Sequence, residues 1–219
     1  PGHYNCPMIK QQRFASFDGQ SIAYHTLGQG RPTLLLHGFL ASAELNWFTP
    51  GLAGQISALG RQVIAPDLRG HGASAILNTD ADYPADVLAM DQEALIAHLG
   101  LVDYDVVSYS LGARTWVRML VRGARPAKLI LGGMGDSGAT TIGSRMAFFE
   151  DAILNGENAA IPAAGQRIQA MMKAQGLSAQ SMLKVLKSQI PTSAEALKSI
   201  ETAILVLNGI DDHDNGSAE

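Results

Sequence analysis

The chain has 219 residues, 47% of them hydrophobic and 6% aromatic, and its formal net charge at pH 7 is −4. This size suits one domain whose core is filled mainly by aliphatic side chains. The charges form no basic stripe, which excludes a typical nucleic-acid-binding surface. Cys6 is the only cysteine, which excludes an intrachain disulfide and a cysteine metal cluster. We expect a cytoplasmic protein without membrane contact, because no apolar run approaches ~20 residues and no signal-peptide pattern is present.

Strands and helices are expected to alternate along most of the chain. Residues 1–7 lack periodicity and precede Met8, so we leave them out of the fold as a candidate expression remnant. Hydrophobic runs bounded by turn signals predict strands at 13–17, 21–27, 33–36, 61–66, 105–109, 127–131 and 204–207. Helical spacing predicts helices within 44–59, at 83–99, from 113 onward and at 193–200. The unbroken apolar run from Leu34 to Leu36 predicts a strand buried on both faces, hence a mainly parallel sheet with helices on both sides.

The alternation stops between residues 137 and 190. Short amphipathic helices are expected there at 148–154, 166–173 and 181–189, with no strand between them. This stretch also contains four methionines, Met146, Met171, Met172 and Met182. They either fill the core or line a permissive apolar pocket, since the thioether side chain adapts its shape.

Ser110 lies in the stretch with the clearest chemical pattern. A β-branched run, Val106-Val107, leads into Ser108-Tyr109-Ser110-Leu111-Gly112, and a predicted helix follows. A strand, a tight turn with serine at its apex and a helix form the context that a nucleophile elbow requires. The strained turn needs small residues two positions before and after the serine. Ser108 and Gly112 meet this need, although glycine is the more usual residue in the first place.

Two upstream stretches, each at the end of a predicted strand, strengthen this interpretation. They are His37-Gly38-Phe39 and Asp67-Leu68-Arg69-Gly70-His71-Gly72. The three motifs in this order resemble the α/β-hydrolase superfamily, in particular its small serine-nucleophile esterases and lactonases. The resemblance runs from about Phe14 to Asp212. It implies an α/β-hydrolase fold in which residues 8–136 and 191–219 form the core and residues 137–190 form a helical cap.

The resemblance also implies a catalytic triad in the chain order serine, acid, histidine. Ser110 is the expected nucleophile. Asp212, at the end of Gly209-Ile210-Asp211-Asp212, is the expected acid, and Asp136 occupies an alternative acid position. Either carboxyl could instead cap a turn without catalytic work. The backbone N–H groups of Leu111 and Phe39 are expected to form the oxyanion hole.

The histidine of the triad has no clear candidate. His37 and His71 lie in glycine-rich loops, and His25 and His98 lie on a predicted strand and helix; all four are expected to be structural. In the superfamily the catalytic histidine follows one more strand after the acid. Here the given sequence ends at Glu219, only seven residues after Asp212, which leaves no room for that strand. His213 directly follows the proposed acid and is a poor candidate for the base. We therefore expect that the last strand, the last helix and the catalytic histidine are missing from this sequence. Either the 219 residues are part of a longer enzyme, or the protein is truncated and has kept the fold without the catalytic machinery.

No cofactor and no metal are expected. The stretch from Gly133 to Gly138 fits a dinucleotide-binding pattern, but it follows the sixth strand instead of the first βα turn of its unit. The acidic residues after Gly209 are consecutive with His213 and lack the spacing of metal ligands.

The sequence therefore predicts hydrolysis of a small, apolar carboxylic ester or lactone through an acyl-Ser110 intermediate. Serine at the elbow argues against the epoxide hydrolase and dehalogenase relatives, which use aspartate there. The alternative is a truncated, non-catalytic protein that binds a small apolar ligand or a partner. A homodimer is also expected, because strand 203–207 would form an apolar sheet edge without lysine or proline.

Overall fold

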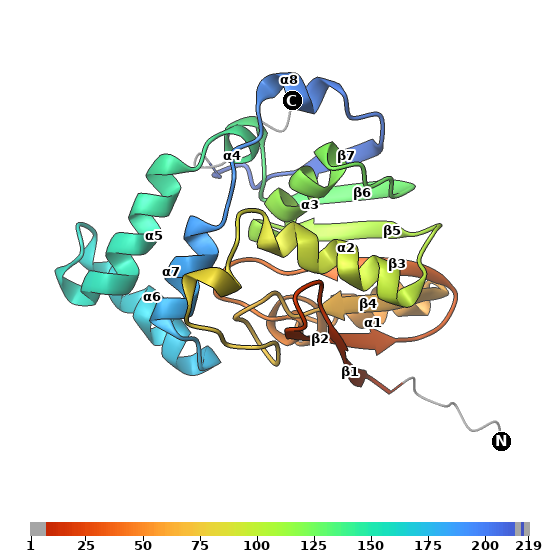
Figure 1. Ribbon diagram of the computed structural model, residues 1–219, viewed down its shortest axis with the longest axis horizontal. Helices are drawn as coiled ribbons and strands as arrows, with labels where there is room; N and C mark the ends of the chain where they lie inside the picture. Colours follow the sequence, from red (N-terminus) through yellow and green to blue (C-terminus); the bar gives the residue numbers. More distant parts are fainter. Residues whose placement is uncertain (1–7, 213–215, 217–219) are drawn as a thin grey trace.

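The computed structural model describes residues 8–212 and residue 216, and a seven-stranded sheet organises them. The strands are β1 Lys10–Ala15, β2 Ser21–Leu27, β3 Arg31–Leu36, β4 Arg61–Pro66, β5 Asp105–Tyr109, β6 Lys128–Gly132 and β7 Ala203–Leu207. Their order across the sheet is β1-β2-β4-β3-β5-β6-β7 (Figure 1). β2 pairs antiparallel with β1 and β4, and the five strands from β4 to β7 are mutually parallel. The expected mainly parallel sheet is confirmed.

Helices connect the strands and cover the sheet. The helical segments are η1 Glu44–Phe48, α1 Leu52–Ala58, η2 Asp80–Asp82, α2 Val87–Leu99, α3 Leu111–Val121, α4 Asp136–Thr140, α5 Gly143–Asn155, η3 Gly156–Asn158, α6 Pro162–Gln175, α7 Ala179–Lys187 and α8 Ala194–Lys198. Between β6 and β7 the described chain forms helices and loops without a strand, as the sequence predicted. The predicted domain boundaries at 136/137 and 190/191 remain predictions.

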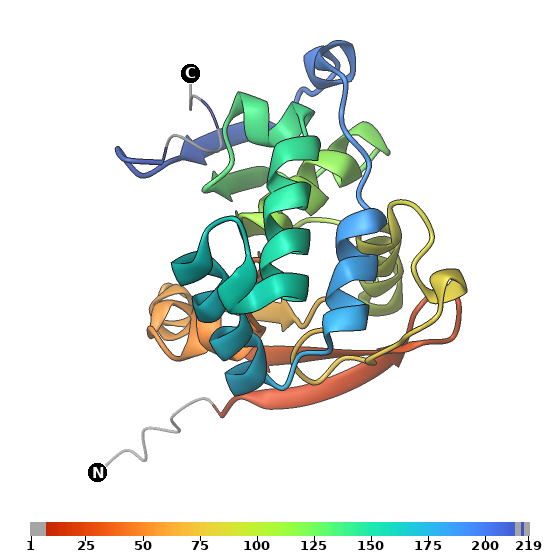
Figure 2. The ribbon, with the colours of Figure 1, turned by 90° about the vertical axis from the view of Figure 1, so that its left-hand side faces the viewer.

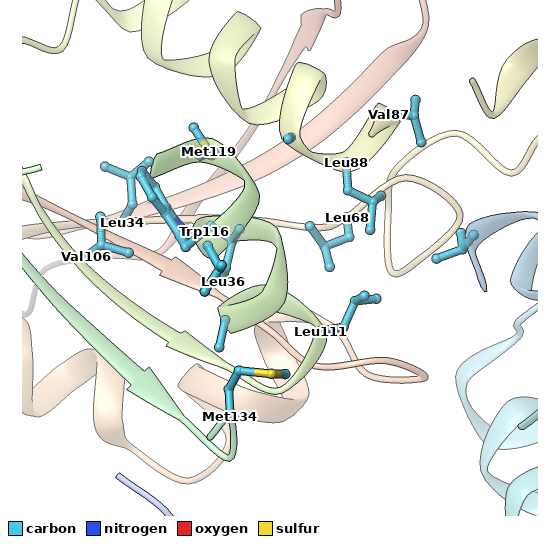
Figure 3. Close-up of a cluster of buried hydrophobic side chains, with 14 of the residues drawn as sticks. Leu34, Leu36, Leu68, Val87, Leu88, Val106, Leu111, Trp116, Met119 and Met134 are labelled. Atoms are coloured by element: carbon cyan, nitrogen blue, oxygen red, sulfur yellow. The ribbon is translucent and has the colours of Figure 1, made fainter. Parts of the chain in front are cut away.

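The sheet is buried on both faces at its centre. Leu34 and Leu36 of β3 belong to the larger hydrophobic cluster, together with side chains of α2 and α3, whereas Leu35 belongs to a second cluster with α1. Alternate residues of a strand point to opposite faces, so α1 covers one face while α2 and α3 cover the other. Trp116 of α3 lies against Leu34 and Val106 in this larger cluster (Figure 3). The unbroken apolar run in β3 reflects this double burial.

Three helices, α5, α6 and α7, form a group at one end of the sheet. Figures 1 and 2 show them beside the strand ends instead of over a sheet face. Their buried residues include Met172 and Met182, while Met171 is exposed and Met146 lines the hollow described below. Met172 and Met182 therefore fill the core and Met146 lines the hollow, whereas Met171 has neither of the two roles that the sequence left open.

Two helices differ from the sequence-based expectation for local reasons. The helix expected from residue 83 begins at Val87, because Asp86 adopts a left-handed conformation with φ 61° and its N–H donates to the Ser188 carbonyl at 2.9 Å. A non-glycine residue in this region interrupts a right-handed helix. Helix α4 was not expected, since its five residues, Asp136–Thr140, are mostly small and polar.

Burial falls steadily from the centre of the sheet toward β7. Leu35, Val107, Ile130 and Leu205 face the same side on four neighbouring strands. Leu35 is fully buried, Val107 and Ile130 are half-buried, and Leu205 is 53% exposed. Helix α1 covers the beginning of this row and leaves its end open. Among the described strands, β7 therefore lies at the edge of the sheet and has exposed apolar side chains.

We expect the 219-residue chain to self-associate through β7, because the outer N–H and C=O groups of an edge strand can pair with another chain. Sedimentation at micromolar concentration should show a dimer. Val206→Lys, which places a charge on the strand, should give a folded monomer. A monomeric parent chain whose Val206 amide is already protected from hydrogen exchange would contradict this expectation.

Candidate active site

The turn between β5 and α3 holds Ser110 in a strained conformation. Its φ and ψ are 52° and −111°, and in the described part of the chain only two other non-glycine residues, Leu40 and Asp86, have positive φ. The Ser110 N–H donates to the Gly132 carbonyl at 2.8 Å, and the Arg114 N–H donates to the Ser110 carbonyl at 2.9 Å. The elbow predicted from the sequence thus has the sharp strand-to-helix geometry of that motif.

The small residues around Ser110 have separate structural reasons. A Cβ atom on Gly112 would lie 2.5 Å from the Leu36 carbonyl oxygen and 2.7 Å from that of His37. Since both atoms belong to the backbone of another strand, they cannot move aside. Ser108 stands where glycine is more usual. Its hydroxyl is buried but not unpaired, because it donates to the Ile130 carbonyl at 2.8 Å.

The loop after β3 brings Phe39 to the same place. A Cβ on Gly38 would lie 3.1 Å from the Tyr109 ring and 3.4 Å from the Ser110 Cβ, so the loop and the elbow are in close contact. The Gly38 N–H donates to the Asn46 side chain at 2.8 Å, which orients this loop. The backbone N–H groups of Phe39 and Leu111 have no acceptor among the described residues. Their role as oxyanion donors remains a prediction.

These residues meet at an open hollow on the surface. Ser110, Leu111 and Phe39 line it, together with a set of apolar side chains from the β6–α4 loop, α5 and α7: Met134, Ile142, Met146, Phe149 and Leu186. Figure 3 labels Leu111 at the start of α3 and Met134, both of which line the hollow. The hollow therefore presents a serine within a largely apolar surface, as expected of a site for a small organic molecule.

The histidines near the elbow are held as neutral structural groups. Nε2 of His37 accepts from the Leu68 N–H at 2.9 Å, so its proton is on Nδ1, which donates to the Gly38 carbonyl at 2.8 Å. Nε2 of His71 accepts from the Leu40 N–H, and Nδ1 donates to the Arg69 carbonyl. Burial, followed by the neighbouring His37, lowers the pKa of His71 to about 3, and burial also lowers the pKa of His37. The prediction that both are structural is supported by these bonds.

The two remaining described histidines also have structural partners. His25 lies 3.0 Å from the Asp67 carboxylate, and the His98 ring stacks on Phe14 at 5.4 Å. Neither lines the hollow. His213, which the sequence did not favour as a base, lies outside the described residues. No histidine of the described chain is therefore placed to take the Ser110 proton.

Both acid candidates follow parallel strands whose carboxyl ends lie on the same side of the sheet as Ser110. Asp136 opens α4 after β6, and Asp212 follows β7, whose register with β6 pairs Leu207 with Gly132. The Asp136 carboxylate accepts from the Ser137 N–H at 2.6 Å, and the Asp212 N–H donates to the Gly209 carbonyl at 3.0 Å. Neither residue lines the hollow itself. The choice between them remains a prediction.

Two arginines at the hollow were not anticipated from the sequence. Arg114 and Arg145 line it beside Ser110. The available signal was the position of Arg114, one turn after Ser110 among the apolar residues of α3, where a charged side chain is unusual. Arg145 precedes a phenylalanine pair in an expected amphipathic segment and carries no such signal.

The described residues show neither a metal site nor a membrane-spanning helix. No group of three or more His, Cys, Asp or Glu side chains in that part of the chain is arranged to hold a metal ion. None of its helices is both long and apolar enough to cross a bilayer.

Comparison with known proteins agrees with this architecture. A family model for the alpha/beta hydrolase fold matches residues 32–138. A non-heme haloperoxidase from Rhodococcus erythropolis is 38% identical over 116 residues, which are 52% of this chain and 40% of that protein. A soluble epoxide hydrolase from a Corynebacterium species is 37% identical over 99 residues, which are 45% of this chain and 32% of that protein. The matches thus span less than half of these relatives' own length.

Solved structures show the same fold over a greater length. The esterase RhEst1 from Rhodococcus sp. ECU1013 is similar with a TM-score of 0.69 at 21% identity, over 91% of this chain and 80% of that chain. The sheet order, the elbow and these matches together show that the chain has the α/β-hydrolase fold.

The contact beneath the elbow leads to a stability prediction. Gly112→Ala should lower the free energy of unfolding by about 1–3 kcal/mol, because the added methyl group overlaps fixed backbone atoms of β3. Gly54→Ala is the matched control. Gly54 lies on the exposed side of α1, where a Cβ meets nothing within 4 Å, and this substitution should stabilise by about 0.5–1 kcal/mol. Urea unfolding of both variants measures the difference, and equal effects would contradict the proposed constraint.

Proposed function

We propose that the protein is a serine hydrolase that cleaves small carboxylic esters or lactones through an acyl-Ser110 intermediate. The observation that carries this proposal is the strained Ser110 turn at an apolar hollow, next to two backbone N–H groups without acceptors. Such a turn stores strain that a structural serine does not need. Esterases among the solved structures with this fold support the same reaction class.

The proposed reaction begins with attack of the Ser110 Oγ on the carbonyl carbon. The hydroxyl proton passes to a histidine base, and the carbonyl electron pair moves onto oxygen, where the Phe39 and Leu111 N–H groups stabilise the negative charge. Collapse of this intermediate breaks the bond to the alcohol oxygen, which takes the proton from the histidine. Water then attacks the acyl-serine by the same route, releases the acid and restores Ser110.

The proposal requires a base that is not among the described histidines. It assigns Asp212 to orient that histidine and keeps Asp136 as the alternative. Serine at position 110 also distinguishes this mechanism from that of the epoxide hydrolase relatives, which use aspartate as the nucleophile. The covalent ester intermediate forms differently in the two cases. A carboxylate attacks without losing a proton, whereas a serine hydroxyl must be deprotonated.

Ser110 can be tested by active-site labelling of the product of the whole gene. A fluorophosphonate should label that protein, and Ser110→Ala should abolish labelling because the attacking hydroxyl is gone. Ser108→Ala is the control, since the Ser108 hydroxyl is buried and bonded to the Ile130 carbonyl. Mass spectrometry identifies the modified residue. Labelling that persists in Ser110→Ala would refute the assignment. A whole-gene product that is neither labelled nor active on esters would favour a non-catalytic binding role.

The acid can be tested by comparing two conservative variants of the same protein. Asp212→Asn should lower kcat on the order of 10⁴-fold, because the base loses its orienting carboxylate. Asp136→Asn should change kcat less than about tenfold, a loss too small for removal of a triad member. Steady-state kinetics with a 4-nitrophenyl ester measures both. The opposite pattern would move the acid to the end of β6.

A further inference from the structure

The hollow at Ser110 contains two positive charges without matching negative ones. Arg114 of α3 and Arg145 of α5 line it, and no Asp or Glu is among the described residues that do so. Neither arginine forms an ion pair within the described chain. This local excess of positive charge contrasts with the net charge of −4 for the whole sequence.

Arg114 is buried in an unusual way. The residue is 7% exposed, and its Nη2 donates to the Gly138 and Thr141 carbonyls. Its Nη1 is buried and has no hydrogen-bond partner. Buried polar atoms are nearly always paired, so an unpaired guanidinium nitrogen calls for an explanation. Long side chains in a helix lean toward its N-terminus, which directs Arg114 toward the Ser110 end of α3.

Two other arginines, the buried Arg69 and the partly buried Arg118, show what a purely structural role requires. Arg69 is fully buried and contacts two carboxylates, with Nη2 at 2.7 Å from Asp91 and Nη1 at 2.6 Å from Asp18. Arg118, one turn after Arg114 on the same helix, lies 2.6 Å from Asp86. Burying a cation is costly unless an anion compensates it. Arg114 therefore differs from its neighbours in lacking the expected anion.

Arg114 nevertheless keeps its charge at neutral pH. Burial, and then repulsion from Arg145 and Arg118, lower its pKa to about 10. Arg145 is half-buried, and its guanidinium lies over the Phe149 ring at 5.6 Å. Apart from Ser110 and Gln189, the other side chains that line this surface are apolar.

We propose that this hollow binds the carboxylate of an acyl substrate, with Arg114 as the principal partner and Arg145 as a second cation. A carboxylate supplies the missing negative charge and accepts from the unpaired Nη1, and arginine is the side chain best suited to bind it. The apolar lining accommodates the uncharged part of the substrate. This inference rests on the proposed function for its reaction, since it makes the preferred substrate an ester that also carries a free carboxylate.

Ligand binding tests the site independently of catalysis. The probes are 4-phenylbutanoate and its uncharged isostere 4-phenylbutanamide, titrated calorimetrically into the product of the whole gene. We expect the carboxylate to bind at least about tenfold more tightly than the amide, since a hydrogen bond to a charged group outweighs a neutral one. Equal affinity would overturn the proposal.

Arginine variants test which residue causes the preference for the carboxylate over the amide. Arg114→Gln should weaken carboxylate binding about 10- to 100-fold and change amide binding less than about threefold. Arg114→Lys, which keeps the charge, should retain part of the preference. Arg122→Gln is the control, because Arg122 lies at the C-terminal cap of α3, outside the hollow, and pairs with Glu93. If Arg114→Gln does not fold, Arg145→Gln should still reduce the preference severalfold. An unchanged preference in folded Arg114→Gln would refute the role of Arg114.

Kinetics separates this proposal from the proposed function. We expect kcat/KM for 4-nitrophenyl hemisuccinate to exceed that for 4-nitrophenyl pentanoate at least tenfold, with the difference lost in Arg114→Gln. Hydrolysis of both esters at equal efficiency would support the serine hydrolase and overturn the carboxylate site. A carboxylate preference in binding without hydrolysis of either ester would support the site and overturn the hydrolase.

Discussion

Close packing of α3 against the end of β3 is the constraint on which this structure depends. Gly112 faces the Leu36 and His37 carbonyls so closely that no side-chain atom fits between them. The chain can reach this contact from β5 only by turning sharply at Ser110, which explains the positive φ of that residue. Gly38 packs against the other side of the same turn. The position of the serine is therefore set by the contact of Gly112 with the backbone after β3 and by the contact of Gly38 with the Tyr109 and Ser110 side chains.

Polar groups beneath the site serve the scaffold. The Asp67 carboxylate accepts from the Ala43 and Ala73 N–H groups at 2.9 Å each and lies 3.0 Å from His25. His37 and His71 join neighbouring loops through both ring nitrogens. Because these groups are fully engaged, they hold the loops that carry Phe39 and leave proton transfer to other residues. Arg114 differs from them, since its charge is buried at the hollow and no residue in the described part of the chain serves as its counterion.

Much of the fold follows from local sequence patterns, and much of the site does not. The apolar run in β3 and the small residues around Ser110 predicted a central strand and an elbow, because each pattern has one physical cause. The start of α2 was misplaced because the left-handed conformation of Asp86 depends on Ser188, far away in the chain. The sequence did not indicate a role for Arg114, because the lack of a carboxylate partner can be recognised only from the folded structure. The sequence pattern favoured Asp212 over Asp136, but both residues follow neighbouring parallel strands, so the strand register does not decide between them.

The central claim is that the backbone aims the Ser110 hydroxyl at a site where Phe39 and Leu111 stabilise an oxyanion. The most direct measurement is a crystal structure of the product of the whole gene after reaction with a phosphonate inhibitor. The account predicts phosphorus bonded to the Ser110 Oγ, with one phosphonyl oxygen accepting hydrogen bonds from both the Phe39 and Leu111 N–H groups. A phosphonate attached to another residue, or an oxygen directed away from both N–H groups, would contradict it.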